Sequence, residues 1–186
     1  MSQDERLKFA KEQRAKHPEL LKPFIHESVK IPPWVKVGEN VTIHENCTIG
    51  TEGFGYVQEG DKWLHIPHVG SVIIEDDVEI YPHSNVDRGT VNDTVIGKGT
   101  KIDHFCHIGH NSRIGKNCVI TAKVVIGGSA VIGDNVWIGP NSTILNKVSV
   151  GDNVYIGSHT NVIKSVGSDV VLVGNPARVI RKIEPE

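Results

Sequence analysis

The chain has 186 residues, a formal net charge of −2 and a hydrophobic content of 38%. A nearly neutral chain argues against general nucleic-acid binding, which depends on neutralising phosphates. No stretch approaches the ~18 consecutive apolar residues of a membrane-spanning helix, and the N-terminus lacks the apolar segment of a secretory signal. We therefore expect a cytoplasmic protein without nucleic-acid partners or integral membrane association.

The first element expected along the chain is a short helix within residues 2–16. Ser2 is followed three positions later by Glu5, which is a capping-box pattern, and Pro18 lies just beyond the segment. The polar sequence of this helix indicates a peripheral arm or a contact with another subunit. We expect residues 1–24 to form this arm.

A six-residue repeat occupies most of the remaining chain. Branched aliphatic residues recur at every sixth position from Ile96 to Val162, and a small or β-branched residue follows four positions after each of them. The same pattern starts at Ile25 and again at Ile74 in other registers. A helix needs apolar residues at a spacing near 3.6 and an amphipathic strand at 2, so a period of six predicts short strands joined by turns. Such a repeat is typical of architectures that bury their apolar side by stacking.

Three strands of the repeat would form one triangular coil with the branched aliphatic side chains inside. Successive coils would pair as parallel strands, and about seven coils are expected ~4.8 Å apart. Gly often follows the aliphatic residue, and Asn and Asp come next, which suits corners with positive φ. The cysteines Cys47, Cys106 and Cys118 occupy small inward positions, so we expect them in the core.

The register of the repeat breaks twice before the long regular stretch. The first break, at about residues 50–71, is long enough for a protruding loop, and the second, near residues 92–95, holds only a few extra residues. A tail begins at about residue 168. Neither break has the character of a domain boundary, so we expect one all-β domain over residues 25–186.

Histidine is the most unusual candidate for chemistry, because three of ten histidines fall in one expected coil: His104, His107 and His110. Imidazoles titrate near neutrality and suit proton transfer, and clustered imidazoles also suit a metal. Any one of them could equally be a solvated corner residue.

The repeat resembles the hexapeptide motif of the left-handed parallel β-helix acyltransferases. This resemblance implies the left hand of the helix and a homotrimer with active sites between neighbouring prisms. The run from Lys101 to Asn111 resembles the segment around the catalytic histidine of the UDP-3-O-acylglucosamine N-acyltransferase family of lipopolysaccharide biosynthesis. That match implies His110 as the catalytic base.

The resemblance to that family covers roughly residues 49–135. The matching segments are Gly53-Phe-Gly-Tyr56, Lys62-Trp63, Ile66-Pro67, Asp76-Asp-Val-Glu-Ile80, Asp87-Arg88-Gly89 and Asp93-Thr-Val-Ile96. The family also carries an N-terminal uridine-binding domain and a C-terminal helical extension associated with acyl carrier protein, which do not fit the segments before Ile25 and after Val166. The tail from Val173 to Lys182 instead resembles the closing segment of sugar acetyltransferases that use acetyl-coenzyme A.

These observations predict an acyltransferase that moves an acyl group, most simply acetyl from acetyl-coenzyme A, to an amino group of a nucleotide-linked sugar. His110 would be the general base, and the resemblance implies that the backbone N–H of Gly128, one coil above, faces the thioester oxygen. Asp87 and Asp103 are the candidates to orient His110. A hydroxyl acceptor stays open, because the same groups serve both reactions.

Residues expected to contact the substrates fall in two groups. The expected sugar- or nucleotide-binding residues are Phe54, Tyr56, Trp63, His83, Arg88 and His107, of which the aromatic residues could also pack the loop against the prism. The residues expected to bind coenzyme A are Lys147, Lys164, Asn175, Arg178 and Arg181, because cations suit its phosphates.

Three alternatives remain on the same fold. An acyl carrier protein could supply the acyl group, as in the lipid A enzymes. A γ-class carbonic anhydrase would carry two histidines five residues apart, whereas His104, His107 and His110 are spaced by three and six, so no metal is expected. A non-catalytic capping or scaffold protein is the third alternative, since the repeat needs no active site to be stable.

Overall fold

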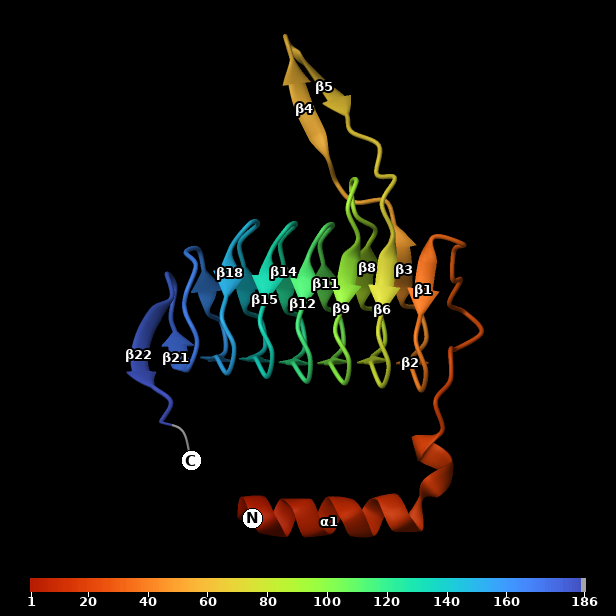
Figure 1. Ribbon diagram of the computed structural model, residues 1–186, viewed down its shortest axis with the longest axis vertical. Coiled ribbons are helices and arrows are strands. Elements are labelled where there is room, and N and C mark those ends of the chain that lie inside the picture. Colours follow the sequence, from red (N-terminus) through yellow and green to blue (C-terminus); the bar gives the residue numbers. More distant parts are fainter. Residues whose placement is uncertain (185–186) are drawn as a thin grey trace.

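Each six-residue repeat supplies one short strand and one turn, and the chain therefore winds into a three-sided prism (Figure 1). The structure is a computed structural model that describes residues 1–184. The first face contains β1 (Val35–Val37), β6 (Val72–Ile74), β9 (Thr94–Ile96), β12 (Arg113–Ile114), β15 (Val131–Ile132) and β18 (Ser149–Val150). The second face contains β2 (Thr42–Ile43), β7 (Glu79–Ile80), β10 (Lys101–Ile102), β13 (Val119–Ile120), β16 (Trp137–Ile138), β19 (Tyr155–Ile156), β21 (Val170–Val173) and β22 (Arg178–Lys182). The third face contains β3 (Thr48–Thr51), β8 (Asn85–Asp87), β11 (His107–Ile108), β14 (Val125–Ile126), β17 (Thr143–Ile144) and β20 (Asn161–Val162).

The strand register confirms the all-β parallel coil expected from the repeat. Ile96 pairs with Ile114 and Ile114 with Ile132, so one coil takes three repeats. The two six-stranded faces correspond to about six complete coils, slightly fewer than the seven expected. The difference arises at the C-terminal end, where β21 and β22 form an antiparallel hairpin on the second face in place of a further full coil.

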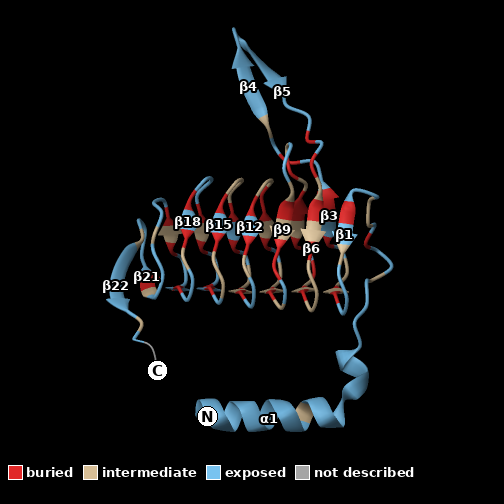
Figure 2. Cartoon of the chain, viewed as in Figure 1, coloured by how far each residue is buried: buried red, intermediate tan, exposed pale blue. Residues whose placement is uncertain are grey.

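The core is a column of branched aliphatic side chains along the prism axis (Figure 2). Every sixth residue points inward, and on the second face Ile80, Ile102, Ile120 and Ile138 are fully buried. All three cysteines are buried as well, and burial raises the pKa of the Cys106 thiol to about 11. The cysteines therefore act as small core residues, as the sequence predicted.

The corners of the prism use glycine differently from the sequence-based expectation. In the regular coils from Ile96 onward, the glycines that follow the inward aliphatic residue do not adopt positive φ, which falls two residues later on residues such as Asn111, Asn135 and Asn153. Glycine is needed at the earlier position because neighbouring coils approach closely there. A Cβ atom on Gly109, for example, would lie 2.7 Å from the backbone nitrogen of Gly128.

The N-terminal helix α1 (Gln3–Lys16) confirms the predicted capping box, since Ser2 and Glu5 exchange both capping hydrogen bonds. None of its residues is buried, and the short 3₁₀ helix η1 (Pro18–Leu21) links it to the prism. Among the described residues, no helix has both the length and the apolar composition needed to cross a membrane.

The predicted loop is a β-hairpin that projects from one edge of the prism (Figure 1). Its strands are β4 (Tyr56–Glu59) and β5 (Lys62–His65), and every residue of both strands is exposed. The hairpin leaves the prism directly after β3 and returns just before β6.

Candidate active site

His110 lies at the edge where the third face turns into the first. We call it the His110 edge, and it consists of the turns at residues 109–112, 127–130, 145–148 and 163–166 together with the loop at residues 52–70. Because each turn stacks on the turn of the next coil, residues about one coil apart become neighbours along this edge. The edge thus brings together the loop and the turn that carries His110.

Asn111 determines the tautomer of His110. Its Oδ1 accepts a hydrogen bond from the N–H of Thr90 at 3.0 Å, and its Nδ2 donates to the carbonyl of Asn92 at 3.1 Å. These two partners identify the oxygen, which lies 3.0 Å from Nδ1 of His110. Because an amide oxygen can only accept, Nδ1 carries a proton, and in the neutral ring Nε2 is the nitrogen that can accept one.

Gly128 lies one coil above His110, and its lack of a side chain makes room for the imidazole. A Cβ atom at position 128 would lie 2.6 Å from Nε2 of His110. Within residues 1–184 the N–H of Gly128 donates no hydrogen bond, whereas its carbonyl accepts one from the N–H of Lys147. An unused N–H close to an unprotonated imidazole nitrogen provides an oxyanion donor and a base.

His68 closes the site on the side of the loop. Its ring packs edge-on against His110 with the centroids 5.0 Å apart, and the residue is only 4% exposed. Its Nδ1 donates to the carbonyl of Ile66 at 2.9 Å, so Nε2 is a buried acceptor that has no partner among the described residues. Gly53 makes room for both rings, because a Cβ atom there would lie 3.0 Å from His68 Nε2 and 3.0 Å from the Cβ of His110.

A surface depression of about 610 Å³ lies beside the His110 turn. Its lining consists of Thr90, Val91, Asn92, Asp93, Asn111, Arg113 and Ser129. The short insertion expected near residues 92–95 thus forms one wall of this depression. It gives a ligand access to the edge that carries His110.

The comparisons with known proteins agree with this fold. The family described as "Bacterial transferase hexapeptide (six repeats)" matches residues 22–51, 93–128 and 129–164, which together exceed half of the chain. The chain belongs to this family. Its fold is the left-handed parallel β-helix, which confirms the hand implied by the sequence resemblance.

Two curated relatives each match less than half of this chain. A UDP-3-O-acylglucosamine N-acyltransferase 2 of Rhodopseudomonas palustris is 50% identical over 76 residues, which cover 41% of this chain and 20% of the relative. A UDP-3-O-acylglucosamine N-acyltransferase of Coxiella burnetii is 46% identical over 90 residues, which cover 48% of this chain and 26% of the relative. The match therefore spans only a fifth to a quarter of the length of these relatives.

One solved structure extends the likeness over most of the chain. The UDP-N-acetylglucosamine O-acyltransferase of Moraxella catarrhalis is 25% identical with a TM-score of 0.62, and the alignment covers 87% of this chain and 70% of that chain.

The two carboxylates expected to orient His110 have other partners in the structure. Asp87 is 6% exposed on the third face, where its Oδ1 accepts from Nδ2 of Asn85 at 2.7 Å and its Oδ2 lies 3.7 Å from Nε2 of His107. Asp103 lies at the edge between the second and third faces, and its Oδ1 accepts from Nδ1 of His104 at 2.6 Å. The polar partners of His110 are instead Asn111 and Thr90, whose Oγ1 lies 3.2 Å from Nδ1.

Two residues expected to bind substrate have structural contacts. Arg88 donates from Nε to the carbonyl of Gly70 at 2.7 Å and from Nη2 to that of Val69 at 3.1 Å, and its guanidinium lies over the ring of Trp34. Arg88 thus holds Val69 and Gly70, at the C-terminal end of the loop, by hydrogen bonds to their carbonyls. His83 stacks on Phe105 with the ring centroids 5.0 Å apart, at the same edge as Asp103.

The aromatic residues of the hairpin do not pack against the prism. Phe54 is 86% exposed and Trp63 is 68% exposed. The ring of Phe54 contacts that of Tyr56, with the centroids 4.9 Å apart, and Tyr56 in turn contacts His65. These rings leave open faces on the hairpin that are available to another molecule.

The expected coenzyme-binding residues divide between two places. Lys147 and Lys164 lie in the turns of the His110 edge above Gly128, and Lys164 and Arg178 line one cavity of about 310 Å³. Asn175 accepts through Oδ1 from Nδ2 of Asn161 at 3.2 Å. Arg181 lies on β22 opposite Val171 on the second face and does not line that cavity.

Proposed function

We propose that the protein is an acyltransferase that transfers an acyl group from a thioester to the amino group of a UDP-linked glucosamine derivative. The observation that carries this proposal is the pairing of an unprotonated Nε2 of His110 with the unused N–H of Gly128. The amine attacks the thioester carbonyl, the N–H of Gly128 stabilises the oxyanion, and Nε2 takes the proton of the amine. The tetrahedral intermediate then expels the thiolate, which leaves with the proton held by His110.

The relatives support an amine over a hydroxyl as the acceptor. The relatives that are 50% and 46% identical over parts of this chain are named N-acyltransferases, whereas the structure with 25% identity is named an O-acyltransferase. A screen that measures thiol release from acyl-coenzymes with a panel of nucleotide amino-sugars tests the reaction directly. If only hydroxyl acceptors support thiol release, the proposed acceptor is wrong.

We assign the acyl carrier to coenzyme A on the basis of the cavity that Lys164 and Arg178 line at the C-terminal end. The names of the relatives favour a lipid A type N-acyltransferase, so acyl carrier protein is the other carrier to test. Both carriers present a thioester on a pantetheine arm. Only coenzyme A adds the 3′-phosphate and the nucleotide pyrophosphate, which are the groups that nearby cations recognise.

Replacement of Lys164 and Arg178 together by Ala should raise the KM for acyl-coenzyme A several-fold and change kcat less. Contacts to remote phosphates are made equally in the ground state and the transition state, so their loss weakens binding uniformly. Steady-state kinetics of the double variant check this, with Arg181→Ala as a control for a β22 cation outside the cavity. An unchanged KM, or turnover with acyl carrier protein alone, contradicts coenzyme A as the carrier.

Light scattering should give a particle of about three times the 20.4 kDa chain mass. The depression beside His110 is open in a single chain and the aromatic residues of the hairpin are uncovered, so we propose a homotrimer in which a neighbouring prism closes the site. A stable monomer with full activity would exclude this arrangement.

A further inference from the structure

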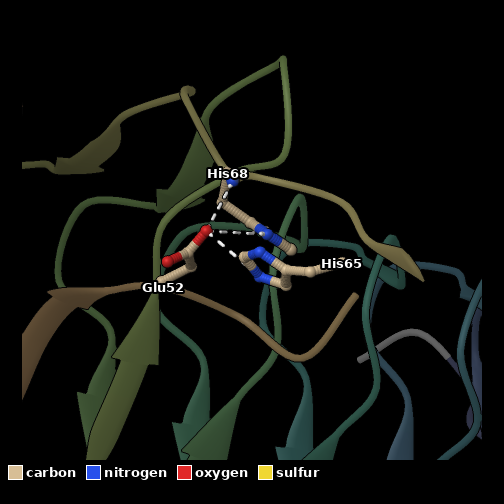
Figure 3. Close-up of side chains that lie close together, drawn as sticks. All are labelled: Glu52, His65 and His68. Carbon is tan, nitrogen blue, oxygen red and sulfur yellow. Dashed lines mark hydrogen bonds and ion pairs between the residues drawn. The ribbon is translucent and has the colours of Figure 1, made fainter. Parts of the chain in front are cut away.

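Three side chains that can bind a metal meet at the base of the hairpin (Figure 3). Glu52 follows β3 directly, His65 is the last residue of β5, and His68 comes three residues later, where the chain returns to the prism. Within residues 1–184 this is the only place where three His, Cys, Asp or Glu side chains gather with their donor atoms close enough to hold one ion. The hairpin thus brings together residues that are separated in sequence.

The distances between these donor atoms approach those of a tetrahedral metal site. Oε1 of Glu52 lies 3.3 Å from Nε2 of His65 and 3.9 Å from Nδ1 of His68, and all three ligand atoms lie within 4.8 Å of one another. Zinc–ligand bonds of ~2.1 Å at tetrahedral angles place neighbouring ligand atoms ~3.4 Å apart. One separation therefore already fits, and small side-chain rotations adjust the others.

We propose that Glu52, His65 and His68 form a binding site for a divalent transition-metal ion such as Zn²⁺, which clamps the β4–β5 hairpin to the prism. Two imidazoles and one carboxylate are a donor set that zinc uses when its fourth position is left open. The side chains of His65 and Glu52 are 41% and 48% exposed, so the ion has a path from solvent. The distances between these three side chains do not depend on the proposed acyl transfer.

The surrounding contacts hold two of the three ligands in place. The N–H of His68 donates to Oε1 of Glu52 at 3.0 Å, and such hydrogen bonds orient metal-binding carboxylates. Because His68 is buried against His110, its ring has little room to move away from Glu52. His65, at the end of an exposed strand, is the ligand with the most freedom to move toward the ion.

Metal binding also connects the hairpin to the His110 site. Nδ1 of His68 now donates to the carbonyl of Ile66, and coordination through this nitrogen requires that the proton moves to Nε2. The buried, unpartnered Nε2 beside His110 then becomes a donor instead of an acceptor. The ion would therefore determine both the direction of the hairpin and the polarity of one wall of the site.

Isothermal titration of the metal-stripped, full chain with zinc chloride tests the site. We expect one Zn²⁺ per chain, and Glu52→Gln and His65→Ala should each weaken binding at least about tenfold. Glu52→Gln is a matched change, because its amide oxygen still accepts from the N–H of His68. His159→Asn is the control, since this exposed histidine lies at another edge in a positive-φ conformation that Asn adopts readily.

Hydrogen exchange provides a second measurement that does not depend on activity. Zn²⁺ should slow exchange across residues 52–68 in the wild-type chain and in His159→Asn, and should have no such effect in His65→Ala. Zinc binding weaker than about 1 mM in the wild-type chain would overturn the site. Equal affinity in the wild-type chain, Glu52→Gln and His65→Ala would also overturn it, and would leave the Glu52–His65 contact as an ion pair only.

Discussion

Replacement of His110 by Ala should lower kcat by at least about a hundredfold, the usual contribution of a positioned general base. Nε2 of His110 is the unprotonated nitrogen that faces Gly128, and Ala offers no group that can take its place. The imidazole is not part of the aliphatic column, so the prism should stay folded. Turnover at saturating substrate and circular dichroism of the same preparation measure both effects.

His159→Asn is the matched control for loss of a histidine, because it lies away from the His110 edge. Addition of free imidazole to His110→Ala should restore part of the activity, which a variant damaged only in its fold would not show. Near-wild-type turnover in a folded His110→Ala protein would exclude His110 as the base, and His107 would then be the next histidine to replace.

The fold could be predicted largely from the period of the sequence. A spacing of six with inward Ile and Val determines the short strands, the triangular coil and the buried column, and the structure has all three. The hand of the helix came from the family resemblance, because the spacing is the same for either hand. The C-terminal tail was harder to predict, since Leu172 pairs with the inward Ile156 after the strict rhythm has ended.

The candidate site was predicted in part, and the reasons are geometric. Gly128 could be paired with His110 by counting one coil. Asp103 is close to His110 in sequence, but the chain turns a corner between them and places the two residues on different edges. The tautomer set by Asn111 depends on hydrogen bonds across two turns, which a linear pattern does not contain.

The cluster of Glu52, His65 and His68 does not follow from the repeat, for a related reason. Its residues lie on both sides of a hairpin, and the hairpin joins strands outside the repeat. The sequence drew attention to His104, His107 and His110, whose regular spacing follows the coil. A search for histidines near the ends of the predicted loop would have found His65 and His68, and Glu52 at the other end of the loop would have completed the set.

Replacement of Gly128 by Ala should lower kcat by up to about a hundredfold while KM changes little, which is the scale expected when a reacting group moves by ~1 Å. The added Cβ would lie 2.6 Å from Nε2 of His110, so the ring must rotate away from the position that Asn111 holds. The φ angle of Gly128 is not positive, so Ala suits the backbone and the effect falls on the imidazole.

Gly167→Ala is the control, because a Cβ atom there meets no atom within 4 Å. Comparison of kcat and melting temperature for the two variants separates catalysis from folding. A stable Gly128→Ala protein with unchanged kcat would show that Nε2 does not act where the N–H of Gly128 can stabilise the oxyanion, and the mechanism would need another donor.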